Sequence, residues 1–262
     1  MRKAIVSGAN GFVGSAVVKE LISQGYEVYA LARENHYDQI PIDEMVRIVP
    51  FSLENIEALG EVIPINEYEA FYHFAWNGSA GVDRADTALQ LKNAQWTVEC
   101  LQMAKRLGCK RFVPAGSIME HETIAAVYTQ GNRPGAGYIY GSGKVAAHMM
   151  CMSMAVKEGI NLVWPKITNA YGPSERSPRL VNSTIRKCIA GEDPQFTAGT
   201  QNYDFVYIDD VARAFRLIGE KGKPFHHYLI GSGKAKALKE FLLEMRAAIA
   251  PDLEFKFGDI PF

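Results

Sequence analysis

The sequence lacks a strong excess of either charge, and its cysteines are few and scattered. Its 262 residues include 28 lysines and arginines and 29 aspartates and glutamates, which gives a formal net charge of −1. Binding to nucleic acid or to an anionic membrane usually depends on a basic surface, so neither partner is expected. Cys100, Cys109, Cys151 and Cys188 lie far apart without metal-ligand spacing, which predicts reduced thiols and no metal site.

Long apolar segments are also missing. No stretch approaches the roughly 20 apolar residues that a transmembrane helix requires. Met1-Arg2-Lys3 leads directly into a short strand pattern, which is not how a signal sequence begins. These features predict a cytoplasmic protein, and the length suits one large α/β domain or such a domain with a small additional lobe.

The main feature that is present is a set of glycines at three-residue spacing: Gly8, Gly11 and Gly14. They follow an apolar strand pattern and precede apolar residues at helical spacing over 15–25, and a second strand pattern follows at 27–31. Glycines in such a β-α-β unit let the backbone approach a pyrophosphate, and the helix start favours its negative charge. A dinucleotide is therefore the expected ligand, and a tight turn without a ligand is the alternative.

The residues after the second strand pattern indicate which dinucleotide fits. Ala32 and Arg33 stand where NAD-binding folds use an acidic residue for the ribose 2′-hydroxyl. A small residue followed by arginine leaves room for a 2′-phosphate and supplies a bidentate cation, which predicts NADP. NAD remains the alternative if Arg33 is only a solvated charge. Ser52 and Leu53, which follow a third strand pattern at 46–50, are expected beside the adenine.

A fourth strand pattern at 70–76 brings further side chains to the carboxyl edge of the expected sheet. Ligands bind at this edge in open α/β folds, so Ala75 is expected near the cofactor. Trp76 either lines a substrate pocket or caps the core. His73, within the same strand, is expected to be structural, and residues 83–107 show helical spacing.

A fifth strand pattern at 110–117 ends in Ser117 at the same edge, and residues 119–137 are expected to be irregular. The helical pattern that follows places Lys144 four residues after Tyr140, on one helix face. A phenol with a pKa of about 10 is a poor base at neutral pH, and a nearby ammonium favours the phenolate. Ser117 is expected to orient a carbinol or carbonyl oxygen toward Tyr140, which predicts a proton relay beside a hydride carrier.

From about residue 174 the pattern changes to short helices and strands with polar breaks, which predicts a smaller lobe. A helix is expected from Arg179 to Ala190. The sequence Gly231-Ser232-Gly233-Lys234 has the composition of a phosphate loop but not its spacing, so a turn after a strand is the prediction.

The motifs occur in a fixed order, namely Gly8-x-x-Gly11-x-x-Gly14, then Asn93, Ser117, Tyr140-x-x-x-Lys144 and the later segments 166–173 and 203–211. This order resembles the extended short-chain dehydrogenase/reductase family, whose members act as sugar-nucleotide epimerases, dehydratases and reductases. The resemblance covers nearly the whole chain. It implies a Rossmann-like, doubly wound parallel sheet in a dinucleotide-binding domain at 1–173, with later returns of the chain, and a mostly substrate-binding lobe at 174–262.

The resemblance also implies roles for individual residues. Tyr140 would be the catalytic acid/base, Lys144 would bind the nicotinamide ribose and tune Tyr140, and Ser117 would hold the substrate oxygen. Further cofactor contacts are implied for Gly8, Asn10, Gly11, Phe12, Val13, Gly14 and Asn93, and further substrate contacts for Asn169 and Tyr203. A homodimer through the helices at 83–107 and 140–156 is implied as well.

Two departures from the family pattern change the expected reaction and substrate contacts. Its 4,6-dehydratases carry an Asp-Glu pair directly after the position of Ser117, whereas this chain has Ile118-Met119, so dehydration is not expected. Tyr203 stands where an arginine usually neutralises substrate phosphate. The candidates to replace that arginine are Arg176, Arg179, Arg186 and Lys187.

The predicted function is NADP(H)-dependent reduction of a keto group on a nucleotide-linked sugar. An epimerase that keeps its cofactor bound is the first alternative. A non-catalytic, cofactor-sensing protein on the same fold is the second, since a fold does not fix an activity.

Overall fold

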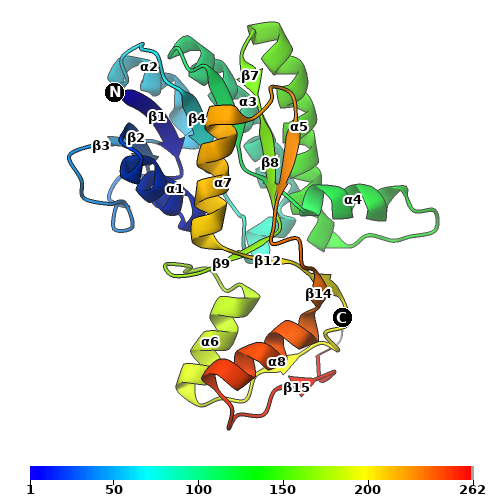
Figure 1. The fold of residues 1–262 in the computed structure, drawn as a ribbon. Helices are drawn as coiled ribbons and strands as arrows, with labels where there is room; N and C mark the ends of the chain where they lie inside the picture. The colour runs from blue at the N-terminus through cyan, green and yellow to red at the C-terminus, as the bar shows by residue number, and fades with distance from the viewer. Residues whose placement is uncertain (261–262) are drawn as a thin grey trace. The chain divides into compact units, whose positions relative to one another are not determined.

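The computed structural model describes residues 1–260 and contains two compact units (Figure 1). The first unit is formed by Met1–Ile167 and Ile208–Ile230, and the second by Thr168–Tyr207 and the chain from Gly231 onward. Residues 168–173, which the sequence assigned to the first domain, thus lie in the second unit. The later return of the chain to the first unit consists of one helix and one strand.

The first unit is built on a six-stranded sheet in the order β3-β2-β1-β4-β5-β7, and all of its neighbouring strands are parallel. The strands are β1 (Arg2–Ser7), β2 (Tyr26–Ala32), β3 (Val46–Pro50), β4 (Ala70–His73), β5 (Arg111–Pro114) and β7 (Asn161–Leu162). Winding reverses between β1 and β4, so the sheet is doubly wound. The predicted Rossmann-like fold class is confirmed.

A three-stranded sheet in the order β13-β8-β6 lies beyond β5 and β7 in the same unit. Its strands are β6 (Gly116–Ser117), β8 (Trp164–Ile167) and β13 (His227–Ile230). Strand β6 follows β5 after one residue, and β8 follows β7 after one residue. The end of β6 therefore carries Ser117 to the carboxyl edge, as the strand pattern predicted.

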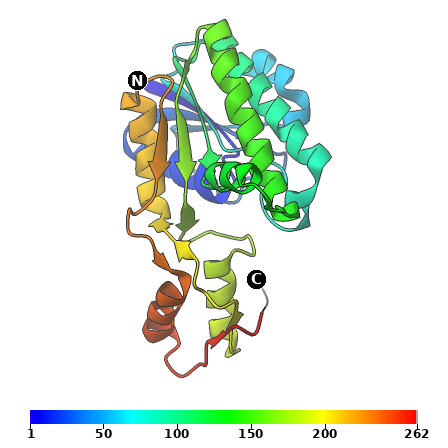
Figure 2. The same cartoon turned by 90° about the vertical axis from the view of Figure 1, so that its right-hand side faces the viewer.

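Helices cover both faces of the sheet, as burial of its strands requires. Helices α1 (Phe12–Ser23) and α7 (Ile208–Lys221) pack together on one face, and α3 (Thr87–Arg106) and α5 (Ile139–Glu158) pack together on the other (Figure 2). Smaller elements are α2 (Leu59–Val62) and the 3-10 helices at Leu53–Ala58, Val82–Ala85 and Ala136–Tyr138.

The prediction of an irregular stretch over 119–137 is wrong for its first half, because Met119–Tyr128 forms helix α4. Its acidic residues Glu120 and Glu122 lie in the first turn, where the helix dipole favours negative charge. The hydroxyl of Ser117 accepts a hydrogen bond from the Met119 N–H at 3.2 Å, which supports the helix start. The glycines and proline that suggested a loop all lie after the helix ends.

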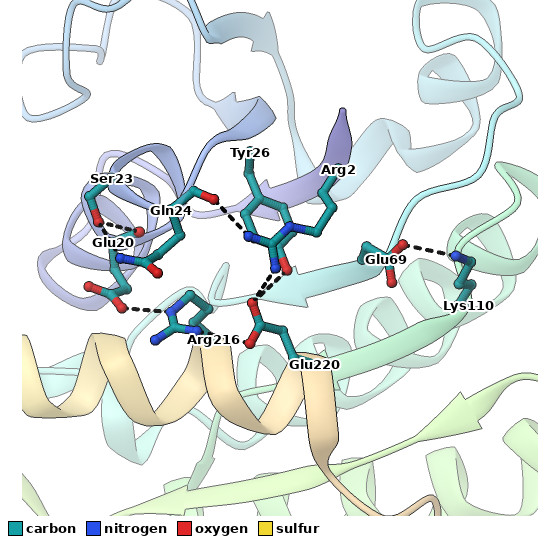
Figure 3. Close-up of polar contacts among 9 residues, drawn as sticks. All are labelled: Arg2, Glu20, Ser23, Gln24, Tyr26, Glu69, Lys110, Arg216 and Glu220. Carbon is teal, nitrogen blue, oxygen red and sulfur yellow. Dashed lines mark hydrogen bonds and ion pairs between the residues drawn. The ribbon is translucent and has the colours of Figure 1, made fainter.

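Helix α7 is held to the rest of the first unit by a polar network near the start of β1 (Figure 3). Arg2 Nη1 lies 2.8 Å from Glu220 Oε1, and the Tyr26 hydroxyl donates to the same oxygen at 2.9 Å. Arg216 binds Glu20 of α1 at 2.7 Å and Glu220 at 2.9 Å. The Arg216–Glu20 ion pair therefore joins α7 to α1, and both of its side chains are mostly shielded from solvent.

The second unit consists of short pairs of strands and two helices. The strands are β9 (Asn169–Tyr171) with β12 (Phe205–Tyr207), β11 (Asn202–Tyr203) with β14 (Lys236–Ala237), and β10 (Gln195–Phe196) with β15 (Lys256–Phe257). The helices are α6 (Leu180–Ala190) and α8 (Leu238–Ile249). A separate small core contains Phe196, Leu238, Leu242 and Phe255.

Candidate active site

Glycine is required at one position in the turn between β1 and α1 and at another in the first turn of α1. Gly8 has a φ of +67°, and a Cβ there would lie 2.7 Å from the backbone nitrogen of Ala75. A Cβ on Gly14 would overlap the carbonyl oxygen of Gly8. The turn therefore brings the start of α1 close to the end of β4, at the carboxyl edge of the sheet.

The start of α1 has the properties of an anion site. Its N-cap is Gly11, no side chain caps this end, and no acidic residue lies in the first turn. The first N–H groups of a helix have no intrahelical acceptor, so those of Phe12 and Val13 are suited to a phosphate oxygen. These residues fit the diphosphate of a dinucleotide.

Asn10 does not use its side chain at this anion site. Its Oδ1 accepts from the Gln39 N–H at 2.7 Å, and its Nδ2 donates to Asp38 at 3.0 Å. The side chain thus ties the glycine turn to the segment after β2. Arg33 begins that segment directly after β2 and is exposed.

The other predicted cofactor residues are held by local hydrogen bonds. Asn93 of α3 is buried, and its side-chain amide accepts from the Asn77 N–H at 2.9 Å and donates to the Asn77 carbonyl at 2.7 Å. It thereby fixes the chain directly after Trp76. Ser52 accepts from the Glu54 N–H at 3.2 Å, at the start of a 3-10 helix, and Leu53 is buried.

Tyr140 lies in the first turn of α5, and only 8% of its surface is exposed. The Trp76 ring meets it edge-on, with centroids 6.0 Å apart. The guanidinium of Arg84 lies 4.3 Å from the Tyr140 ring centroid, and the Lys144 Nζ lies 5.8 Å from it. Two cations are therefore close to the candidate catalytic phenol.

Lys144 is buried, and its Nζ donates to the Ala115 carbonyl at 2.9 Å between β5 and β6. The same atom lies 3.6 Å from the Trp76 ring centroid, a cation–π contact. Burial lowers the pKa of Lys144 to about 7, although the negative charge of Glu120 opposes this shift. Lys144 is therefore close to its own titration point at neutral pH.

Ser117, Tyr140 and Lys144 come from neighbouring elements, since α5 packs against β6. The Ser117 Oγ accepts from the Met119 N–H, which leaves its own proton available for a ligand. The chain of contacts from Gly8 to Ala75, and from Trp76 to Tyr140 and Lys144, joins this group to the glycine turn.

Sequence reasoning missed two residues that support the group, Arg84 and Gln90. Gln90 of α3 is buried, its Oε1 accepts from the Trp76 Nε1 at 2.8 Å, and its Nε2 donates to the carbonyls of Gly78 and Asp83. It thus fixes the loop that carries both Trp76 and Arg84. The available signal was its place three residues before Asn93 on one helix face.

His73 is enclosed in the core. Its Nδ1 lies 2.7 Å from the Ser7 Oγ, and its ring stacks against Phe112. Burial, together with the charge of Lys144, lowers its pKa to about 3. It is therefore a neutral core histidine at physiological pH.

In the second unit, Asn169 donates through Nδ2 to the Asp204 carbonyl at 3.2 Å, and the Tyr203 ring packs on Phe205. The Asp204 carboxylate accepts from the N–H groups of Ser232 and Gly233 at 2.8 and 3.0 Å. The glycine-rich turn at 231–234 therefore uses these N–H groups for an internal carboxylate.

Neither a metal-binding cluster nor a membrane-spanning helix occurs among residues 1–260. Within this range, no group of three histidine, cysteine or acidic residues has the arrangement needed to hold a metal ion. No helix in the same range is both long enough and apolar enough to cross a membrane.

Comparison with known proteins finds one matching family model and several similar proteins. The model of the NAD-dependent epimerase/dehydratase family matches residues 4–231. The CDP-abequose synthase of Salmonella muenchen is 27% identical over 255 residues, which cover 91% of this chain and 78% of that protein. The dTDP-6-deoxy-L-talose 4-dehydrogenase (NAD(+)) of Aggregatibacter actinomycetemcomitans is 27% identical over 261 residues, 94% of this chain and 92% of that protein.

Solved structures share the fold. A UDP-glucose 4-epimerase from Thermotoga maritima with UDP-glucose has a TM-score of 0.81 at 22% identity, over 97% of this chain and 85% of that one. A UDP-glucuronic acid 4-epimerase from Bacillus cereus in complex with NAD has a TM-score of 0.78 at 19% identity, over 97% and 86%.

Proposed function

The chain belongs to the NAD-dependent epimerase/dehydratase family, and we propose that it reduces a keto group on a nucleotide-linked sugar by hydride transfer. The observation that carries the proposal is the group formed by Tyr140, Lys144 and Trp76 at the sheet edge next to the glycine turn. A phenol with adjacent cations is suited to exchange a proton with a carbonyl or carbinol oxygen.

Each residue of this group has one task in the proposed reaction. A bound nicotinamide would supply the hydride. Tyr140 donates its phenolic proton to the substrate oxygen, and the Ser117 hydroxyl binds the same oxygen. Lys144 and Arg84 stabilise the phenolate that remains. The N–H groups at the start of α1, including those of Phe12 and Val13, hold the cofactor diphosphate.

We propose NADP as the preferred cofactor, because Arg33 follows β2 where an acidic residue would select the free ribose hydroxyl. The names of similar proteins mention NAD, so both dinucleotides belong in the assay. The ratio of kcat/KM for NADPH to that for NADH measures the preference.

Reduction is favoured over dehydration for a chemical reason. The residues directly after Ser117 are Ile118 and Met119, which carry no acid or base for water elimination. The next carboxylate along the sequence, that of Glu120, is 1% exposed and accepts hydrogen bonds within the fold. Dehydration would therefore lack its proton-transfer groups.

The substrate contacts are also proposals. Trp76 and Ser117 are the candidates in the first unit, and Asn169 and Tyr203 are those in the second. The absence of an arginine at position 203 leaves the substrate diphosphate to other cations, of which Arg176, Arg179, Arg186 and Lys187 are the candidates.

The test is the Tyr140→Phe variant, which removes only the phenolic hydroxyl. Consumption of NADPH and NADH is followed with a panel of keto-sugar nucleotides. We expect kcat to fall by about 10²-fold or more while the cofactor Kd stays unchanged. Tyr138→Phe, two residues earlier, is the matched control and is expected to retain full activity. Full turnover by Tyr140→Phe would rule out the proposed proton transfer.

Epimerisation is the second candidate, since the family includes epimerases and the same groups serve both reactions. The two differ in the fate of the cofactor. A reductase releases oxidised cofactor at each turnover, whereas an epimerase retains it. Protein that purifies with tightly held NAD and interconverts two sugar nucleotides without net NAD(P)H consumption would favour the epimerase.

We also propose a homodimer formed through α3 and α5. Leu91 of α3 and Met149 and Met150 of α5 are large apolar side chains with at least 59% of their surface exposed. Size-exclusion chromatography with light scattering measures the mass. The double variant Leu91→Glu with Met150→Glu is expected to be monomeric.

A further inference from the structure

A buried carboxylate lies directly behind the candidate serine. Glu120 of α4 is 1% exposed, and its Oε1 accepts from the Ser117 N–H at 2.9 Å and from the Trp164 Nε1 at 3.0 Å. Its Oε2 accepts from the His148 Nδ1 at 2.9 Å and lies 3.4 Å from the Lys166 Nζ. Both oxygens are therefore fully engaged.

These contacts join the elements that carry the candidate catalytic residues. Ser117 ends β6, Trp164 and Lys166 belong to β8, and His148 lies on α5, the helix that carries Tyr140 and Lys144. The His148 ring also stacks on Trp164, with centroids 4.3 Å apart. One carboxylate thus links β6, which ends in Ser117, to α5, which carries Tyr140.

The approach of Glu120 to β6 depends on a glycine. A Cβ at position 116 would lie 2.6 Å from the Glu120 Oε1 and would also overlap the Trp164 indole. Gly116 therefore lets the carboxylate reach the backbone of Ser117.

The charge of Glu120 is stabilised although it is buried. Burial alone would raise the pKa of this carboxyl, but hydrogen bonds from His148, Trp164 and Ser117 and the charge of Lys166 hold it below its ordinary value. A buried charge is expensive unless it is paired and hydrogen-bonded. His121 also contacts this cluster as a neutral ring, because its Nε2 accepts from the Lys166 Nζ at 3.2 Å.

We propose that Glu120 is a positioning residue, which fixes Ser117 relative to Tyr140 and Lys144 by holding the Ser117 N–H from within the core. The proposal rests on the proposed function, because it assigns Ser117 the task of binding the substrate oxygen. Glu120 itself touches neither substrate nor cofactor. It acts through the backbone of Ser117.

The experiment is a double-mutant cycle between Glu120→Gln and Ser117→Ala. Glu122→Gln is the matched control, because Glu122 lies in the same helical turn but is exposed. We expect Glu120→Gln to lower kcat by about tenfold or more and to leave the KM for the sugar nucleotide within about twofold. In the Ser117→Ala background the same change is expected to have less than about a twofold effect.

Equal effects of Glu120→Gln in both backgrounds would overturn the proposal, because Glu120 would then act independently of Ser117. Activity equal to that of Glu122→Gln would overturn it too. If Glu120→Gln does not fold, as judged by circular dichroism, Glu120→Asp keeps the charge but withdraws the carboxylate and takes its place in the cycle.

A second readout separates this proposal from the proposed function. Amide hydrogen exchange of the segment around Ser117 is expected to accelerate in Glu120→Gln and to stay unchanged in Glu122→Gln. If the wild type turned over no keto-sugar nucleotide, the proposed function would fail, and faster exchange would still support the link between Glu120 and Ser117. Unchanged exchange would remove the link itself.

Discussion

We predict that replacing Lys144 with methionine removes a pH-dependent loss of folding stability, because the ammonium of Lys144 is buried in the wild type. The pKa of Lys144 falls from its ordinary value of 10.5 to about 7 because the side chain is buried, with Glu120 opposing the shift. Above about pH 10.5 the amine is neutral in the folded and the unfolded chain alike, so burial carries no charge penalty. As the pH falls toward 7 the unfolded chain binds the proton first, and the folded protein loses relative stability.

The size of this effect follows from the two pKa values. Their difference corresponds to a loss of about 5 kcal/mol in the free energy of unfolding. The full loss applies below about pH 7, where Lys144 is protonated in the folded protein as well. Between about pH 9 and about pH 6, the wild type should lose about 2 to 3 kcal/mol relative to Lys144→Met. The hydrogen bond from Lys144 to Ala115 is lost in the variant at both pH values, so it cancels from this comparison.

The assay is urea unfolding of both proteins at the two pH values and at equal cofactor content. Lys157→Met is the control, because Lys157 is exposed on the same helix. Because Lys157 is solvent-exposed, its substitution should change the free energy of unfolding only slightly at both pH values. A difference between wild type and Lys144→Met that is the same at both pH values would refute the reasoning, since Lys144 would not change its protonation state in this range.

Three other substitutions test separate parts of the site. Gly14→Ala places a Cβ against the Gly8 carbonyl and should lower stability by about 1 to 3 kcal/mol and weaken dinucleotide binding, as measured by unfolding and calorimetry. Arg33→Asp should lower kcat/KM for NADPH by about tenfold or more while sparing NADH; an equal loss for both would contradict a contact with the 2′-phosphate. Arg84→Gln removes a cation 4.3 Å from the Tyr140 ring and should lower kcat by about twofold or more. An unchanged kcat would show that Arg84 does not support the phenol.

The order of strands and helices in the first unit was predictable because its signals are local. Strand β2 is apolar except for Glu27 and is buried over its whole length, and the glycine turn follows β1 at the spacing that a dinucleotide fold needs. Helix α4 was missed because glycines and a proline shortly after it drew the interpretation toward a loop, whereas Met119–Tyr128 contains neither.

The residues that surround the site could not be predicted. They meet through contacts between segments that are distant in the sequence, and the spacing of residues within a motif does not reveal such contacts. Arg84 reaches the Tyr140 ring because Gln90 fixes the loop that carries Arg84, and no sequence motif connects these residues. The role of Asn10 was also hidden. Its neighbours in the sequence form the glycine turn that is the candidate diphosphate site, yet its side-chain amide binds Asp38 and Gln39.

The path of the chain has a consequence for synthesis on the ribosome. Helix α7, which covers one face of the central sheet with Val211 and Phe215, is made only after most of the second unit has been translated. Until then Phe74, whose ring meets that of Phe215 edge to face with centroids 4.8 Å apart, has no cover from that helix. The nascent first unit therefore exposes apolar surface for the time needed to add about 40 residues, a period of seconds in which a chaperone would find a binding site.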